Sequence, residues 1–123
     1  MERYDQSFVE RFLAPWNQHD VDGAVALMTD DCVWEVTRGS EPHGTLFKGT
    51  TAVRAAIADA FQAVPNVHYK PIRSIYGEDH VVVELLVTGT QLDGTQLKYH
   101  ACDILTLADG KIAAKRSYRK MVG

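Results

Sequence analysis

The sequence predicts an α+β domain in which helices pack on one face of a curved antiparallel sheet and leave a conical cavity between the two layers. Helical patterns are confined to the first half of the chain, at 7–16, 19–28 and 49–65, and four strand-like segments joined by short turns follow Pro65. The 123 residues show no repeat or change in composition, so we expect a single domain spanning 1–123. A small apolar ligand would bind in such a cavity.

The first predicted helix begins at a capping box, SFVE, with Ser7 as the N-cap and Glu10 reaching back to it. Pro15 should kink or end this helix. Apolar residues follow the cap at helical spacing, which indicates one buried face: Phe8, Phe12, Leu13 and Trp16.

Two more helices are predicted before the sheet. The segment 19–28 gives a short helix, for which Asp20 is a good N-cap. The segment 49–65 gives a longer one, capped by Thr50 or Thr51 and stopped by the proline at its end.

Strand signals occupy the rest of the chain. CVWEV at 32–36 predicts a strand between the second and third helices. The four later strands contain VHYKPIRSIY, HVVVELLVTGTQ, QLKYHACDILTL and KIAAKRSYR. The turns between them, GED, LDG and ADG, are typical of antiparallel hairpins.

Asp103 lies in the middle of a predicted strand, although aspartate is depleted in strands and a buried carboxylate needs a partner. Alternation gives it apolar neighbours on its own face: Tyr99, Ala101, Leu105 and Leu107. A three-residue ADG turn with Gly110 in the left-handed region places Lys115 opposite Asp103, whereas a two-residue turn places Arg116 there. Both alternatives predict a cation directly opposite the carboxylate.

Composition and charge exclude several functions. The net charge is −3 with basic residues spread along the chain, which does not indicate nucleic-acid binding. Cys32 and Cys102 are far apart, and we expect free thiols and no metal site. Residues 1–13 lack the apolar core of a signal peptide, and no apolar run reaches membrane length, so we expect a cytoplasmic protein.

Three stretches carry a resemblance to a known superfamily: WNQHDVDGAVALMTDDCVWEV at 16–36, FKG at 47–49 and DILTLADGKI at 103–112. Together they resemble the SnoaL-like and ketosteroid-isomerase-like members of the nuclear transport factor 2-like superfamily, over nearly the whole chain. The resemblance implies a cystatin-like α+β roll. Because this superfamily includes isomerases, dehydratases, cyclases, epoxide hydrolases and non-enzymes, the likeness is specific for the fold and weak for the reaction.

The resemblance assigns roles position by position. Asp103 matches the aspartate that donates a hydrogen bond to the dienolate oxygen in ketosteroid isomerase, and also the acid/base aspartate of the SnoaL-like polyketide cyclases. The isomerase's tyrosine corresponds to Phe12 and its catalytic base to Val36, so steroid isomerisation in that form is not expected. Lys115 and Ser117 stand where the SnoaL-like strand usually carries a histidine and an aspartate.

The orientation of Glu84 is left open. Alternation within VVVELLV places Glu84 on the outer face of the sheet, away from the apolar set that should face the helices. Alignment to the isomerase through Asp103 instead implies that Glu84 points inward, where it would be a second carboxylate in the pocket.

The predicted site combines a charged pair with an apolar wall. Asp103 would act as the acid/base, and Lys115, or Arg116, would set its charge. The candidate ligand-binding residues are Phe12, Trp16, Trp34, Val36, Phe47, Phe61, Tyr99 and Ser117. The alternative for the aromatic residues is plain core packing, and for Asp103 a cross-strand salt bridge.

We therefore predict a small, cofactor-independent enzyme that binds an apolar carbonyl compound and catalyses proton transfer, as in isomerisation, cyclisation or dehydration. The alternative is a non-catalytic ligand-binding or protein-interaction domain of the same fold. Neither a metal nor a nucleotide motif is present. The outer face of the sheet is too apolar for the surface of a monomer, so a homodimer is expected through that face, with Val82, Leu86, Ile104 and Tyr118.

Overall fold

The computed structural model describes residues 4–123, so the first three residues of the charged N-terminal segment lie outside the described part. The elements in chain order are α1 (Gln6–Asn17), α2 (Val21–Ala26), β1 (Met28–Glu41), β2 (Gly44–Lys48), α3 (Thr50–Ala63), β3 (His68–Tyr76), β4 (His80–Thr90), β5 (Gln96–Ala108) and β6 (Lys111–Arg119). The predicted α+β class is confirmed. None of the helices within residues 4–123 has the length and apolarity needed to cross a membrane.

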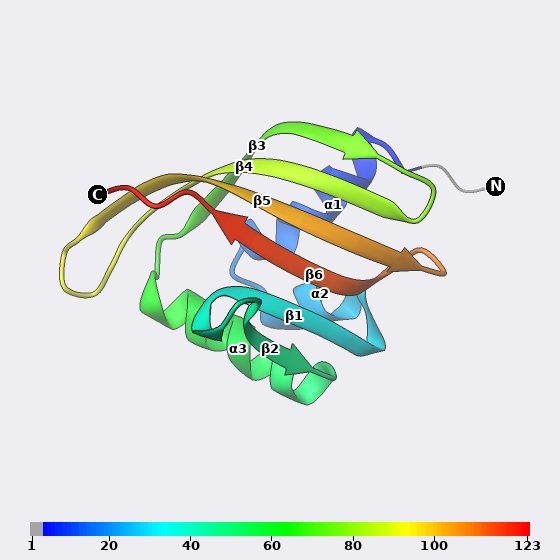
Figure 1. The fold of residues 1–123 in the computed structure, drawn as a ribbon, viewed down its shortest axis with the longest axis horizontal. Coiled ribbons are helices and arrows are strands. Elements are labelled where there is room, and N and C mark those ends of the chain that lie inside the picture. The colour runs from blue at the N-terminus through cyan, green and yellow to red at the C-terminus, as the bar shows by residue number, and fades with distance from the viewer. Residues whose placement is uncertain (1–3) are drawn as a thin grey trace.

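The six strands form one curved sheet in the order β2-β1-β6-β5-β4-β3 (Figure 1). Neighbouring strands are antiparallel except for β1 and β6, which are parallel. Helix α3 packs against β1 and β2, whereas α1 packs near β3, so the helices share the concave side of the sheet.

The strand expected at 32–36 is longer than predicted, and the sequence analysis missed its hairpin partner. Strand β1 runs from Met28 to Glu41, and β2 returns beside it. The second half of β1 and most of β2 are exposed and polar, so apolar alternation gives little signal there.

The helix starts differ from the predictions in two of three cases. In α1 the N-cap is Asp5, not Ser7; its carboxylate accepts hydrogen bonds from the Ser7 backbone N–H at 2.9 Å and hydroxyl at 2.6 Å. This helix ends two residues after Pro15. The N-cap of α2 is Asp20, as predicted, and its side chain accepts from the Gly23 N–H at 3.0 Å.

Helix α3 begins without a side-chain cap. Gly49, rather than Thr50 or Thr51, occupies the N-cap, with φ +86°, a conformation that glycine adopts at little cost. Met28, which the sequence analysis placed in the second helix, is the first residue of β1.

The core lies between the helices and the concave face of the sheet. On β4 the apolar alternation is confirmed, because the inward-facing residues are fully buried: Val81, Val83, Leu85 and Val87. Helix residues meet them from the other side: Phe8, Val9, Phe12, Leu13, Trp16, Val53, Ile57 and Phe61. A charged side chain that faces this core therefore needs an oppositely charged or hydrogen-bonding partner.

Candidate functional site

A β-bulge in β6 turns Lys115 toward the core. The β5–β6 turn has two central residues, Asp109 and Gly110, both with positive φ, and it pairs Ala108 with Lys111. The register then shifts by one residue between the pairs Leu107–Ile112 and Thr106–Ala114. Without this bulge, alternation from the buried Ile112 would point Lys115 outward.

Because of the bulge, the residue opposite Asp103 is not the predicted cation. The residue directly opposite is Ser117, and neither Lys115 nor Arg116 occupies that position. Lys115 pairs with Leu105 and lies diagonally from Asp103 on the same face. Arg116 lies opposite Ile104, where it bonds Glu35 with 3.3 Å between Nε and Oε2.

Asp103 and Lys115 form a buried ion pair. Their residues are 5% and 4% exposed, and Lys115 Nζ lies 3.7 Å from Asp103 Oδ2. Ser117 Oγ donates to Asp103 Oδ1 at 2.8 Å and accepts from Lys115 Nζ at 3.2 Å and from Trp34 Nε1 at 3.1 Å. The serine proton is thus committed to one carboxylate oxygen, and the other oxygen faces the lysine.

Two indole rings enclose the lysine head group. Lys115 Nζ lies 4.2 Å from the ring centroid of Trp16 and 4.4 Å from that of Trp34. The two rings meet edge to face with centroids 5.4 Å apart. Burial lowers the pKa of Lys115, whereas the nearby Asp103 carboxylate acts in the opposite direction. Cation–π attraction to both rings compensates part of the lost hydration.

The charged pair opens into a cavity of about 380 Å³. Its lining includes seven residues that the sequence analysis singled out: Trp34, Val36, Phe47, Tyr99, Asp103, Lys115 and Ser117. Leu85, Val87, Ala56, Ala60 and Ala101 add apolar wall from β4, α3 and β5. A cavity of this size fits a small, mostly apolar molecule.

Three of the candidate ligand-binding residues do not line this cavity. Phe12, Trp16 and Phe61 lie in the core behind it, and Phe12 is only 1% exposed. Trp16 packs edge to face against Phe61, with ring centroids 5.8 Å apart. Its indole N–H is buried without a hydrogen-bond partner among the described residues.

Sequence reasoning missed three polar residues of the lining: Thr37 on β1, Tyr69 on β3 and Asp59 on α3. Burial raises the pKa of Tyr69, and the neighbouring Tyr99 and Asp103 act in the same direction. The alternation of β3 gives a weak signal for Tyr69, because most of that strand is exposed. Asp59 lies on the polar side of the α3 sequence pattern and gives none.

Two arginines lie close to Tyr99, but only Arg38 is part of the cavity lining. Arg119 stacks on Tyr99 with Cζ 3.7 Å from the ring centroid. Burial raises the pKa of Tyr99, although Arg119 and Arg38 act in the opposite direction. The tyrosine hydroxyl therefore stays protonated near neutral pH and is available as a hydrogen-bond donor.

Glu84 lies on the outer face of the sheet, as alternation predicts, and not in the cavity. It is opposite Cys102 and pairs with Arg73 at 3.0 Å between Oε1 and Nε. His100 is also exposed on this face. The inward orientation implied by alignment to the isomerase is therefore wrong.

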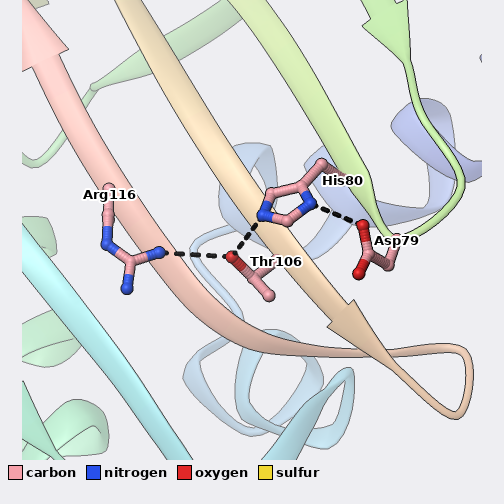
Figure 2. A network of polar contacts seen from close by, with 4 residues as sticks. All are labelled: Asp79, His80, Thr106 and Arg116. Carbon is pink, nitrogen blue, oxygen red and sulfur yellow. Dashed lines mark hydrogen bonds and ion pairs between the residues drawn. The ribbon is translucent and has the colours of Figure 1, made fainter.

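A second polar network lies on the outer face, away from the cavity (Figure 2). His80 Nδ1 lies 2.7 Å from Asp79 Oδ1, and its Nε2 lies 3.2 Å from Thr106 Oγ1. Arg116 Nη1 donates to the same hydroxyl at 3.2 Å. These exposed groups have water as an alternative partner and form no enclosed site.

The two cysteines are free thiols, and burial raises the pKa of both. Within residues 4–123, no three His, Cys, Asp or Glu side chains gather in a way that could hold a metal ion. The groups available for chemistry in the cavity are the carboxylates of Asp59 and Asp103, the Lys115 amine, the Arg38 guanidinium and several hydroxyls.

Solved structures of the same fold have low sequence identity to the chain. A hypothetical protein with a ketosteroid isomerase-like fold from Catenulispora acidiphila, in complex with trimethylamine, has a TM-score of 0.81 and 17% identity, covering 94% of this chain and 86% of its own. TerC co-crystallised with polyporic acid has a TM-score of 0.78 and 20% identity, covering 93% and 89%. A protein of unknown function from Burkholderia pseudomallei, described as nuclear transport factor 2-like, has a TM-score of 0.80 and 16% identity, covering 93% and 88%.

At these identities the structures establish the fold alone. None of the curated proteins matches the sequence significantly. The model of the SnoaL-like domain family, in contrast, matches residues 9–115, which is most of the chain, and the protein therefore belongs to the SnoaL-like domain family.

Proposed function

We propose that this protein is a cofactor-independent enzyme that moves a proton on a small, mostly apolar carbonyl compound. The observation that carries the proposal is the buried Asp103–Lys115 pair, which opens into an otherwise largely apolar cavity. Ionisable groups are rarely buried in such surroundings unless they are paired, and perturbed pairs in clefts mark candidate sites of chemistry.

Asp103 is the proposed acid/base. Ser117 orients the carboxylate by donating to Oδ1, which leaves Oδ2 to accept a proton from a ligand carbon. Lys115 is close enough to stabilise the negative charge that develops on the carbonyl oxygen of the ligand. Removal of a C–H proton next to a carbonyl needs both a base and such a stabilising group.

The walls indicate the ligand class. Trp34, Phe47, Leu85 and Val87 favour a ring system or a branched apolar body, and Tyr69 and Tyr99 add hydroxyl groups. Two of the structural relatives were crystallised with trimethylamine and with polyporic acid, which is consistent with small-molecule binding in this fold.

The proposal is tested with an enolisable aromatic ketone. The rate at which 2-tetralone exchanges its C–H protons in deuterium oxide is followed by proton NMR, with and without protein. We expect the protein to accelerate the exchange, and Asp103→Asn to reduce the acceleration by roughly 10²- to 10⁴-fold. The asparagine keeps the shape of the side chain and can still accept a hydrogen bond from Ser117.

Glu84→Gln is the matched control. Glu84 is also a strand carboxylate paired with a cation, but it lies on the outer face, so its replacement should leave the exchange rate unchanged. Exchange that is equally fast in wild type and Asp103→Asn would contradict the proposed role of Asp103.

A second candidate function is ligand binding without catalysis. The observation in its favour is that Phe12 and Val36, neither of which can transfer a proton, occupy the positions that resemble the isomerase's tyrosine and base. Saturable binding of 2-tetralone, measured by isothermal titration calorimetry, together with no acceleration of exchange, would favour this function over the enzyme.

A further inference from the structure

Lys115 differs from every other lysine in the described part of the chain. The others are exposed: Lys48, Lys70, Lys98, Lys111 and Lys120. Lys115 is 4% exposed, lines the cavity, and has one hydrogen bond, to Ser117. The β-bulge in β6 directs this side chain inward. A desolvated amine facing a ligand cavity is the arrangement in which lysine acts as a nucleophile.

We propose that Lys115 forms a covalent imine with the carbonyl carbon of an aldehyde or ketone bound in the cavity. This goes beyond proton transfer by Asp103, because it assigns a nucleophile and a covalent intermediate. It rests on the same cavity as the proposed function, but it does not require that the ligand lose a C–H proton.

Burial supports the neutral amine that this step needs. Burial in the indole-lined pocket lowers the pKa of Lys115, which increases the fraction of unprotonated amine at neutral pH. The Asp103 carboxylate acts in the opposite direction; transfer of the lysine proton to Asp103 Oδ2, which lies 3.7 Å from Nζ, would leave both groups neutral. In that state the nucleophile and a general acid lie side by side.

The chemistry balances within this pair. The lysine nitrogen attacks the carbonyl carbon and forms a C–N bond, while the carbonyl oxygen takes the proton of the Asp103 carboxylic acid. The resulting carbinolamine passes a proton from nitrogen to the Asp103 carboxylate. Asp103 then protonates the hydroxyl group, the C–O bond breaks, and water leaves, which gives a protonated imine beside the Asp103 carboxylate. No electrons are gained or lost overall.

The cavity gives a bound carbonyl access to the lysine. The rings of Trp16 and Trp34 flank the lysine nitrogen, and Ser117 holds it from its own strand. Lys115 and Asp103 both line the cavity. A carbonyl carbon arriving from the cavity therefore meets the amine with the acid beside it.

The test is reductive trapping on the wild-type protein. The protein is incubated near neutral pH with 2-naphthaldehyde and sodium cyanoborohydride, which reduces an imine to a stable amine. Each adduct adds the mass of the aldehyde less one oxygen atom. Tandem mass spectrometry of the digested protein locates the modified lysines over time. We expect Lys115 to be modified more than about tenfold faster than Lys111, because an aldehyde bound in the cavity faces the Lys115 amine at a high effective concentration.

Two controls separate the pocket from general amine reactivity. Urea-unfolded protein should lose the preference for Lys115, and Lys111→Met, on the same strand, should leave the yield at Lys115 unchanged. Modification of Lys115 no faster than of Lys111, or only of exposed lysines, would overturn the proposal. Because the mapping uses the folded wild-type protein, it does not depend on a Lys115 variant that folds.

The same experiments distinguish this inference from the proposed function. Exchange of 2-tetralone that depends on Asp103, without trapping at Lys115, would retain the proton-transfer proposal and remove the covalent step. Trapping at Lys115 without catalysed exchange would retain the nucleophile and remove the proton transfer.

Discussion

Lys115 lies diagonally across the strand pair from Asp103, with 3.7 Å between Nζ and Oδ2, while Ser117 occupies the position directly opposite. This offset has a consequence for the carboxylate. The serine donates to Oδ1, and Oδ2 is left beside the lysine at the edge of the cavity.

The effects of replacing Asp103 and Lys115 on the free energy of unfolding should be strongly non-additive. Lys115→Met leaves the carboxylate buried without its cation, and we expect a loss of about 3–5 kcal/mol in the free energy of unfolding. Replacing both partners, as Asp103→Leu with Lys115→Met, should cost much less than the sum of the single changes. Urea denaturation of the wild type, the two single variants and the double variant measures the coupling. Additive losses would contradict a buried pair.

Ser117 should matter more than an equivalent hydroxyl on the outer face. Ser117→Ala removes hydrogen bonds to Asp103, Trp34 and Lys115, and we expect a loss of about 1–3 kcal/mol. Thr106→Val removes contacts to His80 and Arg116 in the exposed network of Figure 2, and should change stability by no more than about 0.5 kcal/mol. Thermal unfolding measures both variants. Equal losses in the free energy of unfolding would contradict the expectation that the buried hydroxyl contributes more than the one on the outer face.

The sequence correctly predicts which side chains of β4 and β5 face the cavity, because this depends on the alternation of buried and exposed residues. The apolar alternation of β4 correctly places Glu84 outside, and the alternation of β5 correctly places Asp103 inside. Both strands are regular through the site, so a period of two carries over from sequence to structure without error.

The sequence does not predict what departs from that period. The extra residue in β6 has no marker in the sequence such as glycine. Pairs counted from the ADG turn without this extra residue place the wrong residue opposite Asp103. The sequence also does not show how deep a buried residue lies. Helical spacing correctly puts Phe12 and Trp16 on the buried face of α1, but it does not show that they lie behind the cavity wall. Strand β2 has only five residues, and its two large apolar residues, Leu46 and Phe47, are adjacent, so it shows no alternation.

Tyr69 should make stability fall at alkaline pH. Burial raises its pKa above the ordinary value of 10.0, so the unfolded chain releases this proton at a lower pH than the folded chain. Above about pH 10 the folded state holds more protons than the unfolded state, and the free energy of unfolding decreases as pH rises.

Tyr69→Phe should make this alkaline decrease less steep. Lys115, whose lowered pKa acts with the opposite sign in the alkaline range, and Tyr99 are present in both proteins, so the difference between them isolates Tyr69. Urea denaturation of wild type and variant from about pH 8 to about pH 11 measures the two slopes. Identical slopes would show that Tyr69 ionises equally in both states.

The cavity itself can be filled without touching the charged pair. Ala60 on α3 lines the cavity, and Ala60→Phe should reduce binding of 2-tetralone, measured by isothermal titration calorimetry, while the fold persists by circular dichroism. Ala55→Phe is the matched control, because Ala55 is exposed on the same helix. Unchanged binding in Ala60→Phe would locate the ligand elsewhere.

The outer face of the sheet should form the interface of a homodimer. Ile75 and Tyr118 are 67% and 55% exposed there, and Leu86 faces the same side as the partly exposed Val82 and Ile104. Leu86→Glu would bury an unpaired carboxylate in such an interface, so we expect it to shift the protein to a monomer in size-exclusion chromatography with light scattering. Leu92→Glu is the control, because Leu92 is 77% exposed in the turn between β4 and β5. A wild-type protein that elutes as a monomer would contradict the dimer, and a dimer that survives Leu86→Glu would place the interface on another surface.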